Sequence, residues 1–298
     1  IGAAQADTLW NIMIQTAAAQ NLVTVGFIQT QLHVQVSWLD WLMAAAPYSL
    51  IMVVIYYFLS IYILKPEMKE LPGGVEQIKS MKAAMGPMTG DEKKLLAISI
   101  ALLFFWSTGG KLHHIDTTTC TIVAIALFFM PKIGIMDWSY AQPRVGWGAI
   151  VMFGAGISLG SALLSTKAAD WLATATISMF GLNSAPIFLL IAILGAFLIL
   201  VHLGFASATA LASAMTPIII SVLSGLTTPG VNIIGITMIM QFFICFGFIL
   251  PVNSPQGMVA YNTDTFTVSQ FIRTGVPISI IGYVLALVFT ETYWSWIG

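Results

Sequence analysis

The sequence predicts an all-α protein that crosses a membrane several times, and three observations carry this prediction. Only 8% of the side chains are charged, whereas soluble proteins carry roughly a quarter. The mean hydropathy is +0.91. Several uncharged apolar runs reach about 20 residues, the length that a helix needs to cross a hydrocarbon layer of about 30 Å. An ordinary soluble fold is therefore excluded.

Charge and cysteine usage exclude two further classes of protein. The net charge is −1 and the sequence has no basic stripe, so we expect no nucleic-acid partner. Cys120 and Cys245 both lie in apolar runs, which argues against a disulfide scaffold and against a metal site. The partners that remain are the lipid bilayer and a small molecule.

The expected spans follow one another along the chain. The uncharged runs lie at residues 8–32, 42–64, 95–110, 117–131, 145–166, 184–203, 208–226, 231–263 and 274–290. Six of the eleven basic residues lie in the segment 65–94, which the positive-inside rule places in the cytoplasm as a polar loop. Within this loop, Thr89 and Glu92 have the spacing of a capping box, so the next helix is expected to start there.

Residues 184–226 are predicted to form a re-entrant hairpin. They contain no Asp, Glu, Lys or Arg, and small and polar residues gather near Ser207 and Thr209. Two complete spans would need a polar loop at the membrane surface, which this sequence lacks. A hairpin whose tip ends inside the protein fits better, because non-helical backbone at that depth must be buried or line a cavity. The alternative is one long helix with a small-residue packing face.

The run at 231–265 is predicted to be a broken helix. Its centre reads PVNSPQG, from Pro251 to Gly257, and two prolines and a glycine among polar residues unwind a helix. The alternative is a proline kink without a function. A second interruption at the neighbouring hairpin favours a site, because the N-termini of broken helices direct partial positive charge and free N–H groups to one point. Such a point binds anions.

The polar groups at these interruptions suit a carboxylate or a sulfate. Their hydroxyls and amides are neutral, and the segments have no buried Asp or Glu of the kind that a cation or proton relay needs. His202 is the ionisable residue nearest to the hairpin tip. A single histidine in a membrane is more often a packing residue. Beside an anion site, its imidazolium would supply the positive charge that another carrier takes from a cation.

An internal repeat links the two ends of the chain. The stretch TAAAQN at 16–21 also interrupts an apolar run, and the pattern Pro-x-Ser-[Leu/Ile]-Ile occurs at Pro47 and again at Pro277. Charge counting gives the two proline-containing spans opposite directions, as in transporters with inverted-topology repeats. The repeat predicts that a further hairpin precedes Thr16, upstream of this chain.

Three motifs together resemble the divalent anion/sodium symporter family of dicarboxylate, citrate and sulfate carriers. The stretch from Trp147 through FGAGISL resembles its “WG…FGGGLxL” span, FASATALASAMTPI resembles its hairpin motif “SNTxxxxxxxP”, and LPVNSP resembles its loop “LPVATPPN”. The resemblance covers nearly the whole chain, as the C-terminal half of the family's fold and the end of its first repeat. It implies a homodimeric carrier, not an enzyme, with a scaffold part and a transport part that moves like an elevator.

The resemblance also implies a set of substrate-binding residues at the hairpin tip, at the loop of the broken helix and at the first-repeat loop. They are Ser207, Ala208, Thr209, Asn253, Ser254, Pro255, Thr16 and Asn21. Ala208 departs from the family, because it replaces an asparagine that substrate and sodium share. Asn253 departs from it too, since it stands where a small residue lends its carbonyl to sodium.

Two further features favour sodium-independent exchange. TAAAQN lacks the paired prolines of sodium-coupled members and is similar to the “TAMAAN” of the 2-oxoglutarate/malate exchangers of the family. Those exchangers also carry a histidine shortly before the hairpin tip. The resemblance therefore implies that His202 replaces a coupling cation and that no cofactor is needed.

These expectations define a division of the chain and a function. The expected parts are the end of the first-repeat transport part (1–36), mainly scaffold spans (37–166), an outer connection (167–183), the second transport part (184–266) and the last transmembrane helix (267–298). The expected function is exchange of small dicarboxylates such as 2-oxoglutarate, malate or succinate across the plasma membrane, or across an organelle envelope. The alternatives are a sodium-coupled symporter of dicarboxylates or sulfate and, more remotely, an anion channel.

Overall fold

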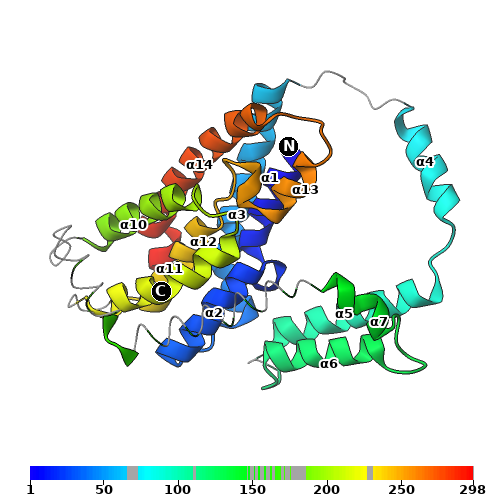
Figure 1. Ribbon diagram of the computed structural model, residues 1–298, viewed down its shortest axis with the longest axis horizontal. Coiled ribbons are helices and arrows are strands. Elements are labelled where there is room, and N and C mark those ends of the chain that lie inside the picture. Colours follow the sequence, from blue (N-terminus) through cyan, green and yellow to red (C-terminus); the bar gives the residue numbers. More distant parts are fainter. Residues whose placement is uncertain are drawn as a thin grey trace. The chain divides into compact units, whose positions relative to one another are not determined.

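The regular elements of the computed structural model are helical in every range that it describes, which confirms the predicted all-α class (Figure 1). The described residues are 1–65, 73–109, 112–145, 186–226 and 231–297, with isolated positions between 147 and 175. Most of the motif that begins at Trp147, and of the connection at 167–183, therefore lies outside them. Chain contacts divide the protein into two units, which are Ile1–Val36 with Asp40–Leu64 and Trp147–Gly298, and Ser37–Leu39 with Lys65–Gly146.

The first unit holds the helices around the predicted substrate-binding residues, together with α3, α14 and α15. They are α1 (Gly2–Met13), α2 (Ala19–Leu32), most of α3 (Trp38–Leu64), α10 (Ile187–His202), α11 (Ala208–Ser224), α12 (Ile233–Ile244), α13 (Pro255–Tyr261), α14 (Val268–Glu291) and α15 (Tyr293–Ile297). By length and apolar composition, α3 and the stretch Val268–Ile297 suffice to cross a membrane. Both contain the predicted prolines, Pro47 and Pro277, inside the helix.

Aromatic side chains fill the core of the first unit. Trp41 of α3 is fully buried, lies edge-on against Phe242 of α12, and donates its indole N–H to the Ile12 carbonyl at 3.0 Å. Tyr48 lies about two turns further along α3. Its ring packs against Phe289, and its hydroxyl donates to a carbonyl of α14. Helix α3 is thereby fastened to both ends of the chain. Because apolar burial drives helix association weakly in lipid, such packing and hydrogen bonding carry it.

Glycine allows the closest backbone approach in this unit. A Cβ atom at Gly275 of α14 would overlap the carbonyl oxygen of Phe248. At Gly195 of α10 a Cβ would lie 2.6 Å from the ring of Phe243. Only glycine lets α14 and α10 pack this tightly on the segment around α12.

Helices α10 and α11 form the predicted hairpin. Helix α10 ends at His202, the chain turns through residues 203–207, and α11 runs back in the opposite direction (Figure 1). The turn excludes the alternative of one long helix. That the tip stops inside the membrane stays a prediction.

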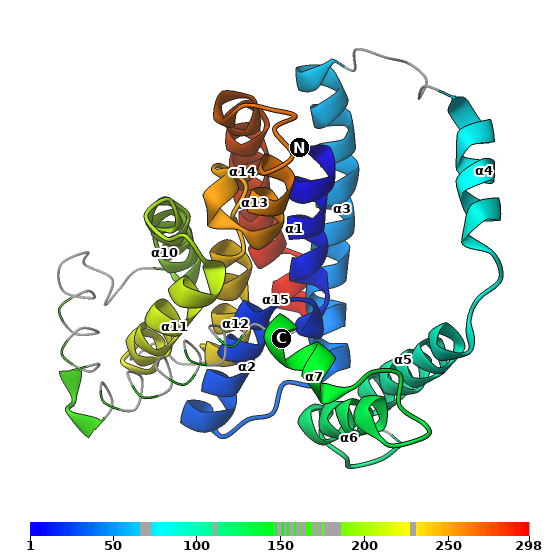
Figure 2. The same ribbon diagram turned by 45° about the vertical axis from the view of Figure 1, so that its right-hand side comes forward.

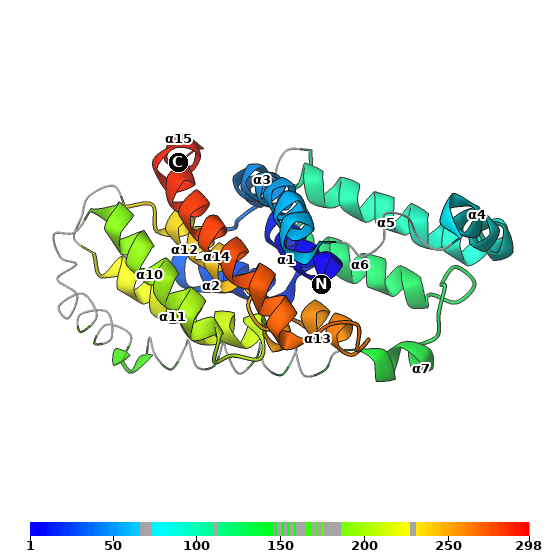
Figure 3. The ribbon, with the colours of Figure 1, turned by 90° about the horizontal axis from the view of Figure 1, so that it is seen from above.

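The second unit holds α4 (Gly74–Met85), α5 (Gly90–Thr108), α6 (Thr117–Phe129) and α7 (Trp138–Ala141). Helices α5 and α6 lie side by side (Figure 3), and the indole of Trp106 donates to the Thr117 carbonyl at 3.3 Å. Helix α4 lies in the segment 65–94, where the sequence predicted only a loop. Its Glu, Gln, Lys, Met and Ala residues favour a helix even without burial.

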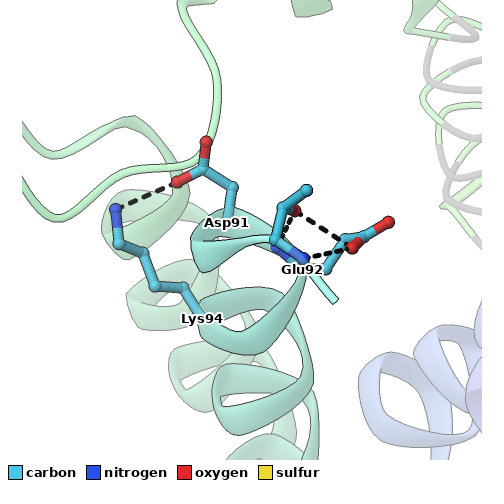
Figure 4. Close-up of polar contacts among 4 residues, drawn as sticks. Asp91, Glu92 and Lys94 are labelled. Atoms are coloured by element: carbon cyan, nitrogen blue, oxygen red, sulfur yellow. Dashed lines mark hydrogen bonds and ion pairs between the residues drawn. The ribbon is translucent and has the colours of Figure 1, made fainter. Parts of the chain in front are cut away.

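The predicted capping box at the start of α5 is confirmed. The Thr89 hydroxyl accepts the Glu92 N–H at 3.3 Å, and the Glu92 carboxylate accepts the Thr89 N–H at 2.7 Å (Figure 4). Asp91 forms an ion pair with Lys94 at 3.0 Å in the same turn. The hydrogen bonds from Thr89 lower the pKa of Glu92 below its ordinary value, because they stabilise the carboxylate.

Candidate functional site

Two interruptions of helices in the first unit share one backbone conformation. The first break (residues 14–18) has Ile14 at φ −110°, ψ 118° and Ala18 at φ −141°, ψ 138°, with a 3-10 turn, η1 (Gln15–Ala17), between them. The second break (residues 250–254) has Leu250 at φ −117°, ψ 140° and Ser254 at φ −141°, ψ 142°, around η4 (Pro251–Asn253). An α-helix follows each break directly. Both predicted interruptions are therefore confirmed as breaks of the helix.

This shared geometry aligns the two halves of the first unit, the N-terminal half at residues 1–36 and 40–64 and the C-terminal half at residues 186–297. Ala18 corresponds to Ser254, Gln20 to Gln256, and Asn21 to Gly257. Thr16, which the sequence analysis compared with the leading threonine of the family's loop, corresponds to Val252. The serine hydroxyl at the second break therefore has no counterpart at the first.

Ser254 caps the helix that follows the second break. Its hydroxyl accepts the Gly257 N–H at 3.1 Å, and its side chain is buried. Pro255 occupies the first helical position, where its missing N–H costs nothing, and is exposed. Gly257 is required here, since a Cβ would lie 2.5 Å from the Pro251 carbonyl oxygen.

The hairpin tip presents the start of α11. Ser207 is extended, and its hydroxyl accepts the Ala210 N–H at 3.4 Å as the N-cap. The N–H groups of Ala208 and Thr209 precede the first intrahelical hydrogen bond, as at every helix start. Among the described residues, the Thr209 hydroxyl has no hydrogen-bond partner. Ala208 is buried, while Ser207 and Thr209 are half-buried.

Asn253 binds the hairpin to the second break. Its amide donates to the carbonyls of His202 and Phe205, both at 2.9 Å. In return, Nε2 of His202 lies 3.2 Å from the Asn253 carbonyl oxygen. Both side chains are buried, and Nδ1 of His202 has no hydrogen-bond partner in the described part of the chain. The predicted site residues His202 and Asn253 are therefore brought together.

Helix α2 brings the first break to the same hairpin. Helices α2 and α11 lie side by side and run in the same direction (Figure 1), joined by a 3.1 Å hydrogen bond between the hydroxyls of Thr24 and Thr216. At 1.5 Å per residue, Thr24 lies about 8 Å from the start of its helix and Thr216 about 12 Å from the start of its own. The N-termini of α2 and α11 therefore lie at the same end of this pair.

Asn21 closes the end of α1 with its side chain. Its amide nitrogen donates to the carbonyls of Asn11 at 2.7 Å and Ile14 at 3.2 Å. Its oxygen accepts from Gln241 at 3.2 Å and from the Cys245 thiol at 3.5 Å. The residue is fully buried. In this structure the polar atoms of Asn21 are used within the protein, whereas Thr16 is half-buried.

Several buried polar residues around the site were missed by the sequence analysis. They are Gln5, Thr8, Thr24, Thr216 and Gln241, each at most 4% exposed. The signal that was available is a glutamine that precedes each break by the same interval, Gln5 before Ile14 and Gln241 before Leu250. The partners that give these two glutamines their place, Phe248 for Gln5 and Thr24 for Gln241, lie more than 200 residues away along the chain, so no local pattern revealed them.

The electrostatic character of the site suits an anion. No Asp, Glu, Lys or Arg occurs among the buried polar residues that the structure describes. In those same ranges, no group of three or more His, Cys, Asp or Glu side chains is arranged to hold a metal ion. Among the described buried residues, the available groups are hydroxyls, helix N–H groups, side-chain amides and the imidazole of His202.

Comparisons with known proteins also indicate a transporter of anions. The whole chain, residues 1–298, matches the family described as “Sodium:sulfate symporter transmembrane region”. A “Membrane protein” of Cupriavidus necator is 50% identical over 100% of this chain and 58% of its own length. An “L-tartrate/succinate antiporter” of Escherichia coli K12 is 26% identical over 97% of this chain and 58% of its own length. The corresponding antiporter of Shigella flexneri is 25% identical.

The chain spans 58% of the length of these relatives. The family and the named antiporters are transporters and not enzymes. Because the family match extends over residues 1–298, the chain belongs to the sodium:sulfate symporter family, the divalent anion/sodium symporters that its motifs resemble.

Proposed function

We propose that the protein is a secondary carrier that exchanges small dicarboxylates across a membrane. The observation that supports this most directly is the hydrogen bonding that joins the hairpin to both breaks, through Asn253 on one side and Thr24 on the other. It gathers the N-termini of α2 and α11, each of which carries roughly half a positive charge, and the start of the seven-residue helix α13. Because no carboxylate is buried among the described residues, these ends favour a dianion.

One carboxylate of the substrate would bind at the hairpin tip. The N–H groups of Ala208 and Thr209 and the hydroxyls of Ser207 and Thr209 offer donors to it. The Thr209 hydroxyl is the strongest candidate, because no described residue satisfies it within the protein. The buried Ala208 side chain leaves this carboxylate without the amide that other family members place there.

The other carboxylate would bind toward the two breaks. Ser254, Pro255 and Thr16 line the expected positions beside it. Asn253 and Asn21 belong to the same site, and their hydrogen bonds suggest that they shape the breaks while neighbouring groups contact the substrate. A contact from either amide would require it to release a backbone carbonyl.

The relatives support a dicarboxylate over sulfate. The proteins of Escherichia coli and Shigella are named as antiporters of tartrate and succinate, which are four-carbon dicarboxylates. Succinate and tartrate are therefore the first substrates to test, with malate and 2-oxoglutarate as close analogues. The family description favours a second candidate, sodium-coupled symport of sulfate or a dicarboxylate.

His202 is proposed to act in place of a coupling cation. It lies buried at the tip, with its Nδ1 atom unpartnered among the described residues. An imidazolium there would offset part of the charge of the substrate. Sodium is then not required for exchange.

The proposal extends to the movement of the protein. The matching breaks support an inverted repeat, and we propose that the elements around them move together as the transport part of an elevator. A homodimer and a place in the plasma membrane complete the proposal. The division into a mainly scaffold part at 37–166 and transport parts at 1–36 and 184–266 remains part of it.

Uptake of labelled succinate by the full-length protein in proteoliposomes tests the function. Vesicles are empty or preloaded with tartrate, each with and without sodium. Uptake only into preloaded vesicles, unchanged by sodium, supports exchange. Uptake into empty vesicles that needs sodium supports the symporter instead, and uptake that preloading fails to accelerate indicates a channel.

A further inference from the structure

Gln5 and Gln241 occupy equivalent places in the two halves of the first unit. Each lies in the helix that leads to a break, and each precedes the extended residue at that break, Ile14 or Leu250, by nine residues. Both side chains are at most 1% exposed. A buried amide must satisfy its donors and its acceptor inside the protein, so the partners of these two residues are informative.

Gln5, in the helix before the first break, holds the approach to the second break. Its amide nitrogen donates to the Phe248 carbonyl at 2.8 Å and to the Phe271 carbonyl at 3.3 Å. Its oxygen accepts the Tyr56 hydroxyl at 2.7 Å. Phe248 lies two residues before Leu250, the first residue of the second break.

Gln241, in the helix before the second break, reaches the first break through Asn21, whose amide donates to the Ile14 carbonyl. Its amide nitrogen donates to the Asn21 side chain at 3.2 Å and lies 3.4 Å from the Cys245 sulfur. Its oxygen accepts the Thr24 hydroxyl at 2.6 Å, and this hydroxyl also bonds Thr216 of the hairpin. The glutamine therefore links α2, α11 and α12.

A second pair of glutamines repeats the crossed arrangement. Gln256, directly after the second break, donates to the Thr8 hydroxyl of α1 at 2.7 Å. Its counterpart Gln20, directly after the first break, reaches the Cys245 sulfur at the end of α12 at 3.8 Å. Helices α1 and α13 accordingly lie in contact (Figure 2).

We propose that Gln5 and Gln241 are positioning residues, each of which holds the break of the opposite half in place. The crossed hydrogen bonds fix the two breaks relative to each other. When a substrate binds at one break, the protein groups at the other break are therefore already in position to bind it. The expected effect on substrate affinity rests on the proposed function. The crossed hydrogen bonds of Gln5 and Gln241, called the bracing below, are a property of the fold and can be measured without a substrate.

The test uses Gln241→Met and Gln5→Met in the full-length protein, since methionine keeps the side-chain length and removes the hydrogen bonds. Amide hydrogen exchange is followed at residues 14–21 and 248–254, and KM and the maximal rate are measured for succinate exchange. Gln241→Met is expected to speed amide exchange at 14–21, and Gln5→Met at 248–254. Each variant is expected to raise KM about tenfold and to change the maximal rate less than about twofold, because binding and not movement is disturbed.

Thr237→Val is the matched control. Thr237 lies one turn before Gln241 on α12 and is 1% exposed. Among the described residues, its hydroxyl bonds the Ile233 carbonyl of its own helix and no other group. It should change neither break nor KM. If Gln241→Met does not fold, Thr24→Val removes one donor to the same amide and should give the same shift at 14–21.

The outcomes separate this inference from the proposed function. Wild-type exchange of succinate, together with an unchanged KM and unchanged amide exchange at 14–21 in Gln241→Met, overturns the bracing alone. If the wild type exchanges no dicarboxylate, the proposed function is wrong. The amide-exchange measurement alone then tests whether each glutamine holds the break of the opposite half. An effect at the break of the opposite half then supports the bracing. An effect confined to the variant's own half overturns it.

Discussion

His202 and Asn253 hold each other through hydrogen bonds that run in opposite directions. The Asn253 amide donates to the His202 carbonyl at 2.9 Å, and the His202 imidazole lies 3.2 Å from the Asn253 carbonyl oxygen. Because both contacts are buried, the end of α10 cannot shift against the second break without breaking them. Buried hydrogen bonds therefore join the hairpin tip to the loop that carries Ser254.

Asn253→Ala should weaken this junction. It leaves the carbonyls of His202 and Phe205 buried without their donor, which costs about 1–3 kcal/mol for each group. We expect a lower thermal unfolding temperature, measured in detergent, and a higher KM for succinate. Ser213→Ala is the control, since within the described part of the chain that hydroxyl bonds only the Thr209 carbonyl of its own helix. Equal stability of the two variants would contradict the assigned role.

Thr209→Val separates binding from folding at the hairpin tip. The Thr209 hydroxyl has no partner among the described residues, and valine has nearly the same shape. The unfolding temperature should stay within about 1 °C, while the KM for a dicarboxylate rises about tenfold through loss of one hydrogen bond to a charged group. Titration of tartrate by isothermal calorimetry measures this. An unchanged affinity would remove Thr209 from the proposed site.

Ser207→Ala should differ from Thr209→Val, because Ser207 also caps α11. Loss of an N-cap costs about 0.5–2 kcal/mol. We expect both a lower unfolding temperature and a weaker affinity for tartrate in the same two measurements. A variant that loses affinity without losing stability would mean that the 3.4 Å cap contact contributes little.

The capping box at α5 predicts a pH dependence in the second unit. Hydrogen bonds from Thr89 lower the pKa of Glu92 in the folded state. The contribution of the box is therefore complete above the ordinary carboxyl pKa of about 4.3 and is lost as the pH falls through the lower folded value. Amide exchange at residues 90–93, corrected for the intrinsic pH effect, should rise at acid pH. In Glu92→Ala it should be fast throughout, with Asp91→Asn as the control.

The breaks could be predicted from the sequence because residues within each break disfavour a helix. Pro251, Pro255 and Gly257 disfavour a helix wherever they stand, and the polar TAAAQN stretch marks the first break in the same way. The start of the first break at Ile14 was not predicted, because isoleucine in an apolar run gives no signal for an extended residue. The Ile14 carbonyl instead accepts a hydrogen bond from the side chain of Asn21, seven residues further on.

The connections between the breaks could not be predicted in the same way. Gln5 and Gln241 are unremarkable within their own helices, and their meaning depends on partners in the opposite half of the first unit. The role of Asn21 depends likewise on Gln241 and Cys245. Sequence motifs located the hairpin tip and the second break, whereas the hydrogen bonds that fasten them together required the fold.

His202 provides a test of charge compensation through pH. If its imidazolium offsets substrate charge, affinity for a dicarboxylate should rise as the pH falls from about 8 to about 6, because the positive form becomes more populated. The KM of the wild type for succinate exchange should then fall over this range, while that of His202→Asn stays flat and higher. The succinate carboxyl groups remain largely ionised over this pH range, so the change of KM with pH reflects a titration of the protein. A wild-type KM that does not change with pH, or a His202→Asn variant with the same slope, would leave the residue with the structural role that its contact with Asn253 already gives it.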